Sequence, residues 1–258
     1  MISKNNIKLI RSLELKKFRL AENLFLAEGN KLVTDILESA LEVEFLFATE
    51  AYLESAGALA GRAKTIVTCS HAEIRKASLL KNPQQCLALC RIPAYTPTEA
   101  QLFSHLVLCL DNIQDPGNLG TIMRTADWFG ISDIFCSVDS ADLFNPKAVQ
   151  ATMGAICRVR VHYRDLTAYL EEANQRQTPV FGAFLDGENI YQTQLADTGI
   201  VVLGNEGRGI GPELTPLISH KIHIPAFSPP GQKVESLNIS VAAAVICSEF
   251  RGRSARRQ

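Results

Sequence analysis

Residues 202–212 read VLGNEGRGIGP, a short apolar run that leads into a loop rich in glycine. An apolar run ends at Leu203, and four glycines follow within eight residues. Glycine lets a backbone approach another group closely, so we expect a ligand-binding loop after a buried strand, with a plain glycine-rich turn as the alternative. The loop lacks both the glycine fingerprint of dinucleotide-binding enzymes and the lysine of a P-loop. A nucleotide phosphate and a dinucleotide-dependent oxidoreductase are therefore disfavoured.

The sequence around this loop alternates between strand-like and helix-like patterns from Leu106 onward. Alternation of this kind predicts an α/β fold with a mostly parallel sheet covered on both faces. Ligands of such sheets bind at the carboxyl ends of strands. The expected strands are 106–110, 134–137, 159–163, 180–184, 200–203 and 222–224, and the expected helices are 119–129, 147–152 and 237–250.

A second, smaller α/β unit is expected from Lys4 to about Cys90. A charged helical stretch over 7–18 comes first, and a helix is expected at 31–37. The pattern lapses between Arg91 and Gln101, where two prolines indicate a linker. We thus expect domains at 1–95 and 106–258 joined by a linker at 96–105. The strands expected in the first domain are 24–27, 43–47, 65–67 and 86–89.

Composition narrows the class of protein. The chain has 258 residues and a formal net charge of −1, which is not the basic balance of a protein that coats nucleic acid. The sequence contains no run of 18 apolar residues, so we expect no membrane span. The first residues lack the apolar core of a secretory signal, so we expect no such signal. The seven cysteines favour buried, reduced thiols in a cytoplasmic protein. Cys86 and Cys90 lack the further ligands of a zinc site, so no metal is expected.

Two further loops carry polar residues after expected strands. In the first, a Pro116-Gly117 turn precedes Asn118, which is expected to cap the next helix. Arg124 follows six residues later among apolar neighbours, and the alternative for it is an ordinary ion pair with Asp115 or Asp127. The last loop places Ser236, Leu237 and Asn238 before an alanine-rich helix, which Ser236 or Asn238 is able to cap.

In their order and separation, the three loops resemble the three motifs of the SpoU (TrmH-like) family of the SPOUT methyltransferases, over residues 106–250. The stretch FLAEGNKLV at 25–33 is similar to the opening strand and helix of the ribosomal-protein-like RNA-binding domain of many members. The resemblance implies a C-terminal trefoil knot, S-adenosylmethionine bound bent within it, and a homodimer. It implies transfer of a methyl group to a ribose 2′-hydroxyl of RNA.

The same resemblance implies the site residues. The cofactor would lie against Leu203, Gly204, Asn205, Ile224 and Leu237, and the acceptor ribose against Asn118, Arg124, Glu206, Ser236 and Asn238. The family's activator of the hydroxyl corresponds to Arg124. Because arginine stays protonated in proteins, we expect Arg124 to stabilise the developing alkoxide, oriented by Asn118 and Glu206. Ser236 and Asn238 are expected to fix the third loop.

The RNA is expected to be ribosomal, because the N-terminal domain adds a shape-reading surface. Its basic stretch offers phosphate contacts at Lys8, Lys16, Lys17 and Arg19. The alternatives are a transfer RNA 2′-O-methyltransferase, a base methyltransferase, or a non-catalytic RNA-binding protein of ribosome assembly. The chain departs from many members in a longer segment at 226–235, and it carries Trp128, expected in core packing, where small residues are common.

Overall fold

The computed structural model describes residues 1–98, 102–227 and 236–257, and the chain divides into two compact units. Unit 1 comprises Met1–Ala94 and Asp142–Arg158, and unit 2 comprises Tyr95–Ala141 and Val159–Gln258. The segment 142–158 therefore packs with the N-terminal residues although its neighbours in sequence belong to unit 2. The predicted domains, 1–95 and 106–258, instead placed the segment 142–158 in the second domain. We call Asp142–Arg158 the exchanged segment. The predicted linker at 96–105 includes residues 99–101, which lie outside the described residues.

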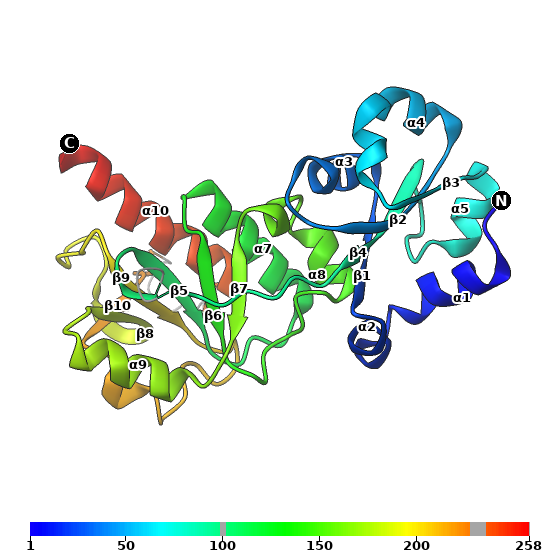
Figure 1. The fold of residues 1–258 in the computed structure, drawn as a ribbon. Coiled ribbons are helices and arrows are strands. Elements are labelled where there is room, and N and C mark those ends of the chain that lie inside the picture. The colour runs from blue at the N-terminus through cyan, green and yellow to red at the C-terminus, as the bar shows by residue number, and fades with distance from the viewer. Residues whose placement is uncertain (99–101, 228–235, 258) are drawn as a thin grey trace. The chain divides into compact units, whose positions relative to one another are not determined.

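Unit 1 is built on a four-stranded sheet of order β1-β4-β2-β3. β4 is antiparallel to both β1 and β2, whereas β3 runs parallel to β2. Figure 1 shows α3 and α4 close to this sheet. The elements are α1 (Lys4–Ser12), α2 (Lys16–Glu22), β1 (Leu24–Glu28), α3 (Asn30–Glu38), β2 (Val43–Ala48), α4 (Glu50–Ala56), η1 (Gly57–Arg62), β3 (Thr65–Thr68), α5 (His71–Ala77) and β4 (Cys86–Arg91), with α8 (Pro146–Ala151) and η2 (Ala155–Cys157) from the exchanged segment.

Arg19 of α2 is a structural residue of unit 1. Its side chain is 2% exposed. Its guanidinium donates to the carbonyl oxygens of Leu13 and Glu14 at 2.7 and 2.8 Å, and pairs with Asp142 at 2.6 Å. The expected contact of Arg19 with phosphate is therefore wrong, because the guanidinium is buried and donates its hydrogen bonds to groups within unit 1. The stretch predicted as one charged helix is also two helices that break at Leu13–Leu15.

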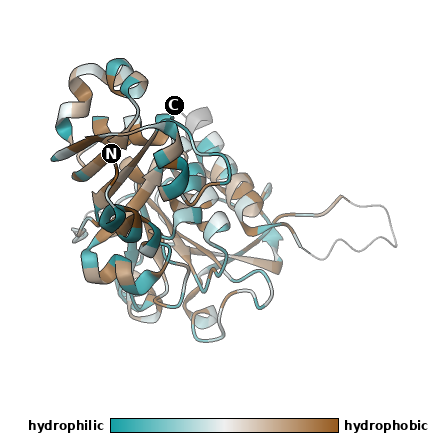
Figure 2. Cartoon of the chain, turned by 90° about the vertical axis from the view of Figure 1, so that its right-hand side faces the viewer, coloured by the Kyte–Doolittle hydropathy of each residue, from teal (hydrophilic) through white to brown (hydrophobic). Residues whose placement is uncertain are grey.

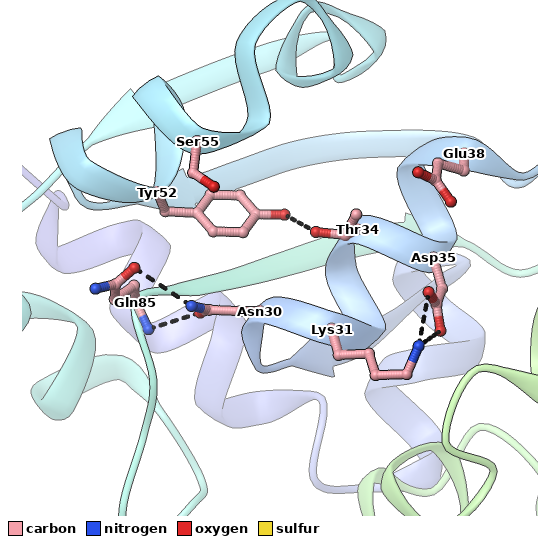
Figure 3. Close-up of a pocket in the computed structure, with 8 residues that line it drawn as sticks. All are labelled: Asn30, Lys31, Thr34, Asp35, Glu38, Tyr52, Ser55 and Gln85. Carbon is pink, nitrogen blue, oxygen red and sulfur yellow. Dashed lines mark hydrogen bonds and ion pairs between the residues drawn. The ribbon is translucent and has the colours of Figure 1, made fainter.

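A polar pocket of about 340 Å³ opens between α3 and α4 (Figure 3). Its side chains largely bind one another. The hydroxyls of Thr34 and Tyr52 lie 3.0 Å apart, and Lys31 pairs with Asp35 at 3.3 Å. No residue of the three sequence motifs lines this pocket, which is formed by Asn30, Lys31, Thr34, Asp35, Glu38, Tyr52, Ser55 and Gln85.

Unit 2 contains a six-stranded sheet of order β10-β8-β9-β5-β6-β7 in which every described pair is parallel. This confirms the predicted α/β fold with a mostly parallel sheet. Its elements are β5 (Leu106–Leu110), α7 (Pro116–Trp128), β6 (Asp133–Cys136), β7 (Arg160–Tyr163), α9 (Leu166–Gln175), β8 (Val180–Asn189), β9 (Gly199–Leu203), η3 (Thr215–Leu217), β10 (His220–His223) and α10 (Ile239–Arg257). The sequence patterns did not predict α4, α5 or α9.

The central strands of this sheet are buried on both faces, and Figure 2 shows apolar residues along the strands. Val107 and Cys109 of β5 join one core cluster with Tyr169 and Leu170 of α9. Because side chains alternate along a strand, the remaining β5 residues face the opposite side. The helices α7 and α10 pack against each other. The cysteines are all free, and all but Cys157 are buried, as predicted.

Two negative findings concern the described residues alone. No helix among residues 1–98, 102–227 and 236–257 is long and apolar enough to cross a membrane. In the same residues, no three histidine, cysteine or acidic side chains gather in a way that would hold a metal ion.

Asp133, at the start of β6, is the centre of a buried ionic cluster. It is fully buried, and its carboxylate accepts hydrogen bonds from Arg160, His162 and Ser132 at 2.7–2.9 Å. Burial raises the pKa of this carboxyl, but the hydrogen bonds outweigh burial and hold the pKa well below its usual range. A folded-state pKa below the unfolded value means that ionised Asp133 stabilises the folded protein.

We predict that Asp133→Asn lowers the free energy of unfolding by about 1.5–3 kcal/mol at pH 7, the value of hydrogen bonds to a charged group. The contribution of Asp133 is complete above about pH 5, begins to decline as the pH falls below the unfolded pKa of about 4, and is lost as the pH approaches the much lower folded-state pKa. Urea unfolding at pH 7 and again at about pH 2.5, well below the unfolded pKa of an aspartate, measures this change, with the exposed Asp139→Asn as control. A difference between wild type and variant that persists undiminished at low pH would contradict the assignment.

Candidate active site

The neighbouring strands β5 and β9 bring two of the three loops to one edge of the sheet. Leu110 lies beside Leu203 in the register, so both loops begin at the same level. The backbone N–H of Asp111 donates to the carbonyl of Leu203 at 2.9 Å. The carboxyl ends of parallel strands are where α/β sheets bind ligands.

Side chains fasten these two loops together. The Asp111 carboxylate accepts from the backbone N–H of Gly211 at 2.8 Å, and the Asn205 amide donates to the carbonyl of Asn112 at 2.8 Å. Burial raises the pKa of Asp111 despite this hydrogen bond. These bonds hold the glycine-rich loop against the end of β5.

The glycine-rich loop closes on itself in a tight turn. Asn205 and Gly209 exchange two backbone hydrogen bonds, of 3.0 and 2.8 Å. The Asn205 side-chain oxygen also accepts from the backbone N–H groups of Gly207 and Arg208. The turn leaves the side chains of Glu206 and Arg208 exposed.

The first loop leads into α7, which is capped by Asp115 and not by Asn118 as expected. The Asp115 side chain accepts from the backbone N–H of Asn118 at 2.8 Å, and Pro116 occupies the first helical position. Asn118 is thus the third residue of the helix, and its side chain is available for other contacts.

A chain of side-chain hydrogen bonds joins all three motifs. The Asn118 amide nitrogen donates to Glu206 at 2.6 Å, and the Asn238 amide nitrogen donates to the Asn118 oxygen at 3.1 Å. Asn238 in turn caps α10, because its side-chain oxygen accepts from the backbone N–H of Ser240 at 2.9 Å. Of the five predicted catalytic residues, the structure therefore brings together Asn118, Glu206 and Asn238.

Arg124 and Ser236 do not join this chain. Both side chains are exposed, and neither makes a hydrogen bond or an ion pair within the described residues. Arg124 follows Asn118 by six residues, which is roughly 9 Å along a helix axis. The expected orientation of Arg124 by Asn118 and Glu206 is therefore not seen as a direct bond. The alternative pairing of Arg124 with Asp115 or Asp127 is not seen either.

The predicted cofactor residues combine buried strand ends with open loop positions. Leu203 and Gly204 are buried, Asn205 and Ile224 are partly buried, and Leu237 is 46% exposed. Space is open beside the loop, because a side-chain carbon at Gly209 would meet nothing within 4 Å. These residues suit a ligand held by backbone groups and one apolar side chain. The segment expected to differ at 226–235 lies outside the described residues from 228 onward.

Sequence reasoning missed Ser240, Asp115 and Asp111 at this site. Asp115 precedes Pro-Gly, a pattern that signals a helix start and identifies the cap more directly than Asn118. The roles of Asp111 and Ser240 depend on contacts between loops and had no local signal. Trp128 was expected in the core but is 85% exposed, which corrects that prediction.

Comparison with known protein families gives two matches that together cover most of the chain. The SpoU rRNA methylase family matches residues 105–248, and the MRM3-like substrate binding domain matches residues 4–88. The chain is 31% identical over 247 residues to the 23S rRNA (guanosine(2553)-2′-O)-methyltransferase of Bacillus subtilis, which covers 94% of each protein.

Solved structures give a similar result. A TrmH-family protein from Porphyromonas gingivalis superposes with a TM-score of 0.86 at 40% identity, over 98% of this chain and 99% of that one. An rRNA methyltransferase from Sinorhizobium meliloti, determined with AdoMet bound, superposes with a TM-score of 0.82 at 26% identity, over 98% and 97%.

We predict that Gly204→Ala disrupts the glycine-rich loop. An added side-chain carbon would lie 2.2 Å from the backbone carbon of Gly209, so the turn would have to open. Overpacking of this kind costs about 1–3 kcal/mol. Thermal unfolding should show the loss for Gly204→Ala and almost none for Gly207→Ala, where the nearest atom is 3.5 Å away. Equal melting temperatures for the two variants would argue against a close loop.

Proposed function

The chain belongs to the SpoU rRNA methylase family, and we propose that it transfers a methyl group from S-adenosylmethionine to a ribose 2′-hydroxyl of RNA, with ribosomal RNA as the substrate. The observation that carries the proposal is the hydrogen-bonded chain Glu206–Asn118–Asn238. It unites one polar side chain from each motif at the carboxyl edge of the sheet. The named activity of the Bacillus subtilis relative, which matches along nearly the whole chain, supports the acceptor.

S-adenosylmethionine supplies an electrophilic methyl group on a sulfonium. The site offers what such a ligand requires: the buried end of β9 at Leu203, the open backbone at Gly209, and the exposed Leu237. The protein residues hold the acceptor hydroxyl in place, which lowers the barrier by up to roughly 7–11 kcal/mol in ideal cases.

Arg124 binds the ribose-phosphate beside the acceptor hydroxyl in this proposal. It is exposed, and no described residue occupies its hydrogen-bond donors, which suits a contact with RNA. A guanidinium has five donors and no acceptor, so it stabilises negative charge on the ribose or phosphate but does not take up a proton.

Unit 1 would hold the RNA substrate. Its match to a substrate binding domain supports this role. The side chains of Lys8, Lys16 and Lys17 are exposed on α1 and α2 and suit contacts with phosphate, whereas Arg19 is buried. The charge contacts supply affinity, and the fold of the unit supplies shape recognition.

We further propose a cytoplasmic homodimer with a knotted C-terminal region. The contacting helices α7 and α10 leave apolar side chains exposed at Trp128 and Val241, 85% and 48% respectively, which a second copy would cover. Family membership supports the knot and the bound conformation of S-adenosylmethionine.

The direct test is transfer of radiolabelled methyl from S-adenosylmethionine to RNA from cells lacking this protein, with products resolved as nucleosides. We expect a 2′-O-methylated nucleoside with wild type and a rate about 10²–10³ lower with Arg124→Ala, the effect of removing one charge-stabilising donor. Arg124→Lys should recover only part of the rate, because it keeps the charge but loses the fork. Arg75→Ala, an exposed arginine of unit 1, is the control.

The result separates the alternatives. Label in a base would favour base methylation. Label found only in transfer RNA would identify transfer RNA, and not ribosomal RNA, as the substrate. Normal turnover by Arg124→Lys would contradict the proposed role of the Arg124 guanidinium in stabilising negative charge. Binding of RNA without transfer to any RNA would favour a ribosome-assembly protein.

We predict that replacing both Lys16 and Lys17 with glutamine weakens RNA binding and flattens its dependence on salt. Each lost phosphate contact reduces the slope of log K against log salt by about 0.7–0.9. Fluorescence anisotropy over a range of salt concentrations measures the slope. Lys64→Gln is the matched control, because Lys64 already pairs with Glu42 and Glu44. An unchanged slope would place the RNA elsewhere.

A further inference from the structure

The hydrogen-bonded chain across the motifs has a fixed direction, which begins at Ser240. The backbone N–H of Ser240 and its hydroxyl lie 2.9 and 2.6 Å from the side-chain oxygen of Asn238. A backbone N–H only donates, so the atom of Asn238 that faces it must be the oxygen. The amide nitrogen of Asn238 therefore points the other way.

This polarity passes from one amide to the next. The Asn238 nitrogen donates to Asn118 at 3.1 Å, so Asn118 must present its oxygen there. The Asn118 nitrogen is then turned toward Glu206, to which it donates at 2.6 Å. The helix cap of α10 thus determines that Glu206 Oε1 is an acceptor, and it does so through two side chains from different motifs.

The second carboxylate oxygen of Glu206 is Oε2. Within the described residues the Glu206 side chain makes no other hydrogen bond. Of the other carboxylates near the loops, Asp111 is buried and binds Gly211, and Asp115 caps α7. Glu213 lies beside Gly211, but among the described residues it makes no hydrogen bond to a motif side chain. Arg124 has no lone pair for a proton. Glu206 is the carboxylate that lies on the chain of motif residues and has a free acceptor.

We propose that Glu206 accepts the proton of the ribose 2′-hydroxyl, and that Asn118, Asn238 and Ser240 position it; this inference rests on the proposed methyl transfer. A lone pair of the 2′-oxygen forms the new O–CH₃ bond, and the S–CH₃ bond breaks with its electron pair remaining on sulfur. The hydroxyl proton passes to Glu206 Oε2 and from there to water. The products are a 2′-O-methyl ribose and a neutral thioether, so charge and atoms balance.

A carboxylate suffices for this step. An isolated 2′-hydroxyl is far too weak an acid to give its proton to a carboxylate. As the bond from oxygen to the methyl carbon forms, however, the oxygen gains positive charge and its proton becomes strongly acidic. The proton can then move to a weak base within hydrogen-bond reach, and such general-base assistance contributes about 10²–10⁴-fold in enzymes.

The first test is chemical rescue of Glu206→Ala in the full-length protein. We expect kcat to fall by about 10²–10⁴-fold while the affinities for S-adenosylmethionine and RNA, measured directly by calorimetry and anisotropy, stay near wild type. Added formate supplies a carboxylate in the vacated space and should raise the rate in proportion to its concentration. Glu171→Ala, at an exposed glutamate of α9 away from the three loops, is the matched control and should keep wild-type turnover.

The second test addresses the direction of the chain. Asn238→Asp keeps the cap of α10, but it has no amide proton to donate to Asn118. The Asn118 amide then turns its nitrogen to the new carboxylate and its oxygen to Glu206. We expect an unchanged or higher melting temperature together with a lower kcat. In ligand-free protein, the side-chain amide protons of Asn118, followed by NMR, should shift in Asn238→Asp and in Glu206→Ala alike. Ser248→Ala on the same helix is the control.

Several outcomes would overturn the assignment. Glu206→Ala with normal kcat, loss of activity that formate leaves unchanged, or loss explained wholly by weaker RNA binding would each remove Glu206 as the proton acceptor. Unshifted Asn118 amide protons in both variants would contradict the proposed series of hydrogen bonds from Asn238 through Asn118 to Glu206. Failure of the proposed function is distinguishable, because wild type itself would then transfer no methyl group while the ligand-free NMR result would still stand.

Discussion

The candidate site depends on the pairing of β5 with β9 at the centre of the unit 2 sheet. The two strands are far apart in the sequence, yet Leu106–Leu110 runs in register with Gly199–Leu203. Parallel pairing places the ends of both strands at one edge and requires the chain to pass through other parts of the fold between them. The bonds of Asp111 with Gly211 and of Asn205 with Asn112 then become short loop-to-loop contacts. Displacing either strand by one residue would break both.

The site combines a rigid scaffold with reactive groups on its surface. The strand ends are buried and the glycine-rich turn is closed by its own backbone, whereas the side chains of Glu206, Arg208 and Arg124 are exposed. Such a division suits a protein whose acceptor is a large polymer. The backbone fixes where the polar groups stand, and the polymer displaces water from them when it binds. In this arrangement these three charged groups stay hydrated until the substrate arrives, so the ligand-free protein avoids the cost of desolvating them.

The sequence predicted the strands of the second unit well because buried parallel strands are continuous apolar runs, as in Leu106–Leu110 and Gly199–Leu203. The three loops were found because glycine, proline and asparagine mark turns and caps locally, and the family resemblance gave them roles. The helices α4, α5 and α9 were missed because their apolar positions are few or mixed with polar ones. Trp128 and Arg19 were misplaced for a different reason: whether a side chain is buried depends on what packs over it. The partner of Arg19 is Asp142, more than a hundred residues away.

The exchanged segment Asp142–Arg158 has a consequence for modularity. The chain passes between the two units three times, at 94–95, at 141–142 and at 158–159. An N-terminal fragment cut at residue 95 would keep the buried guanidinium of Arg19 but lack the carboxylate of Asp142 that neutralises it. Unit 1 is therefore not a single continuous stretch of the sequence, and one cut does not separate it with all of its contacts intact. A transfer of the N-terminal residues that keeps this ion pair must therefore carry Asp142 along with them.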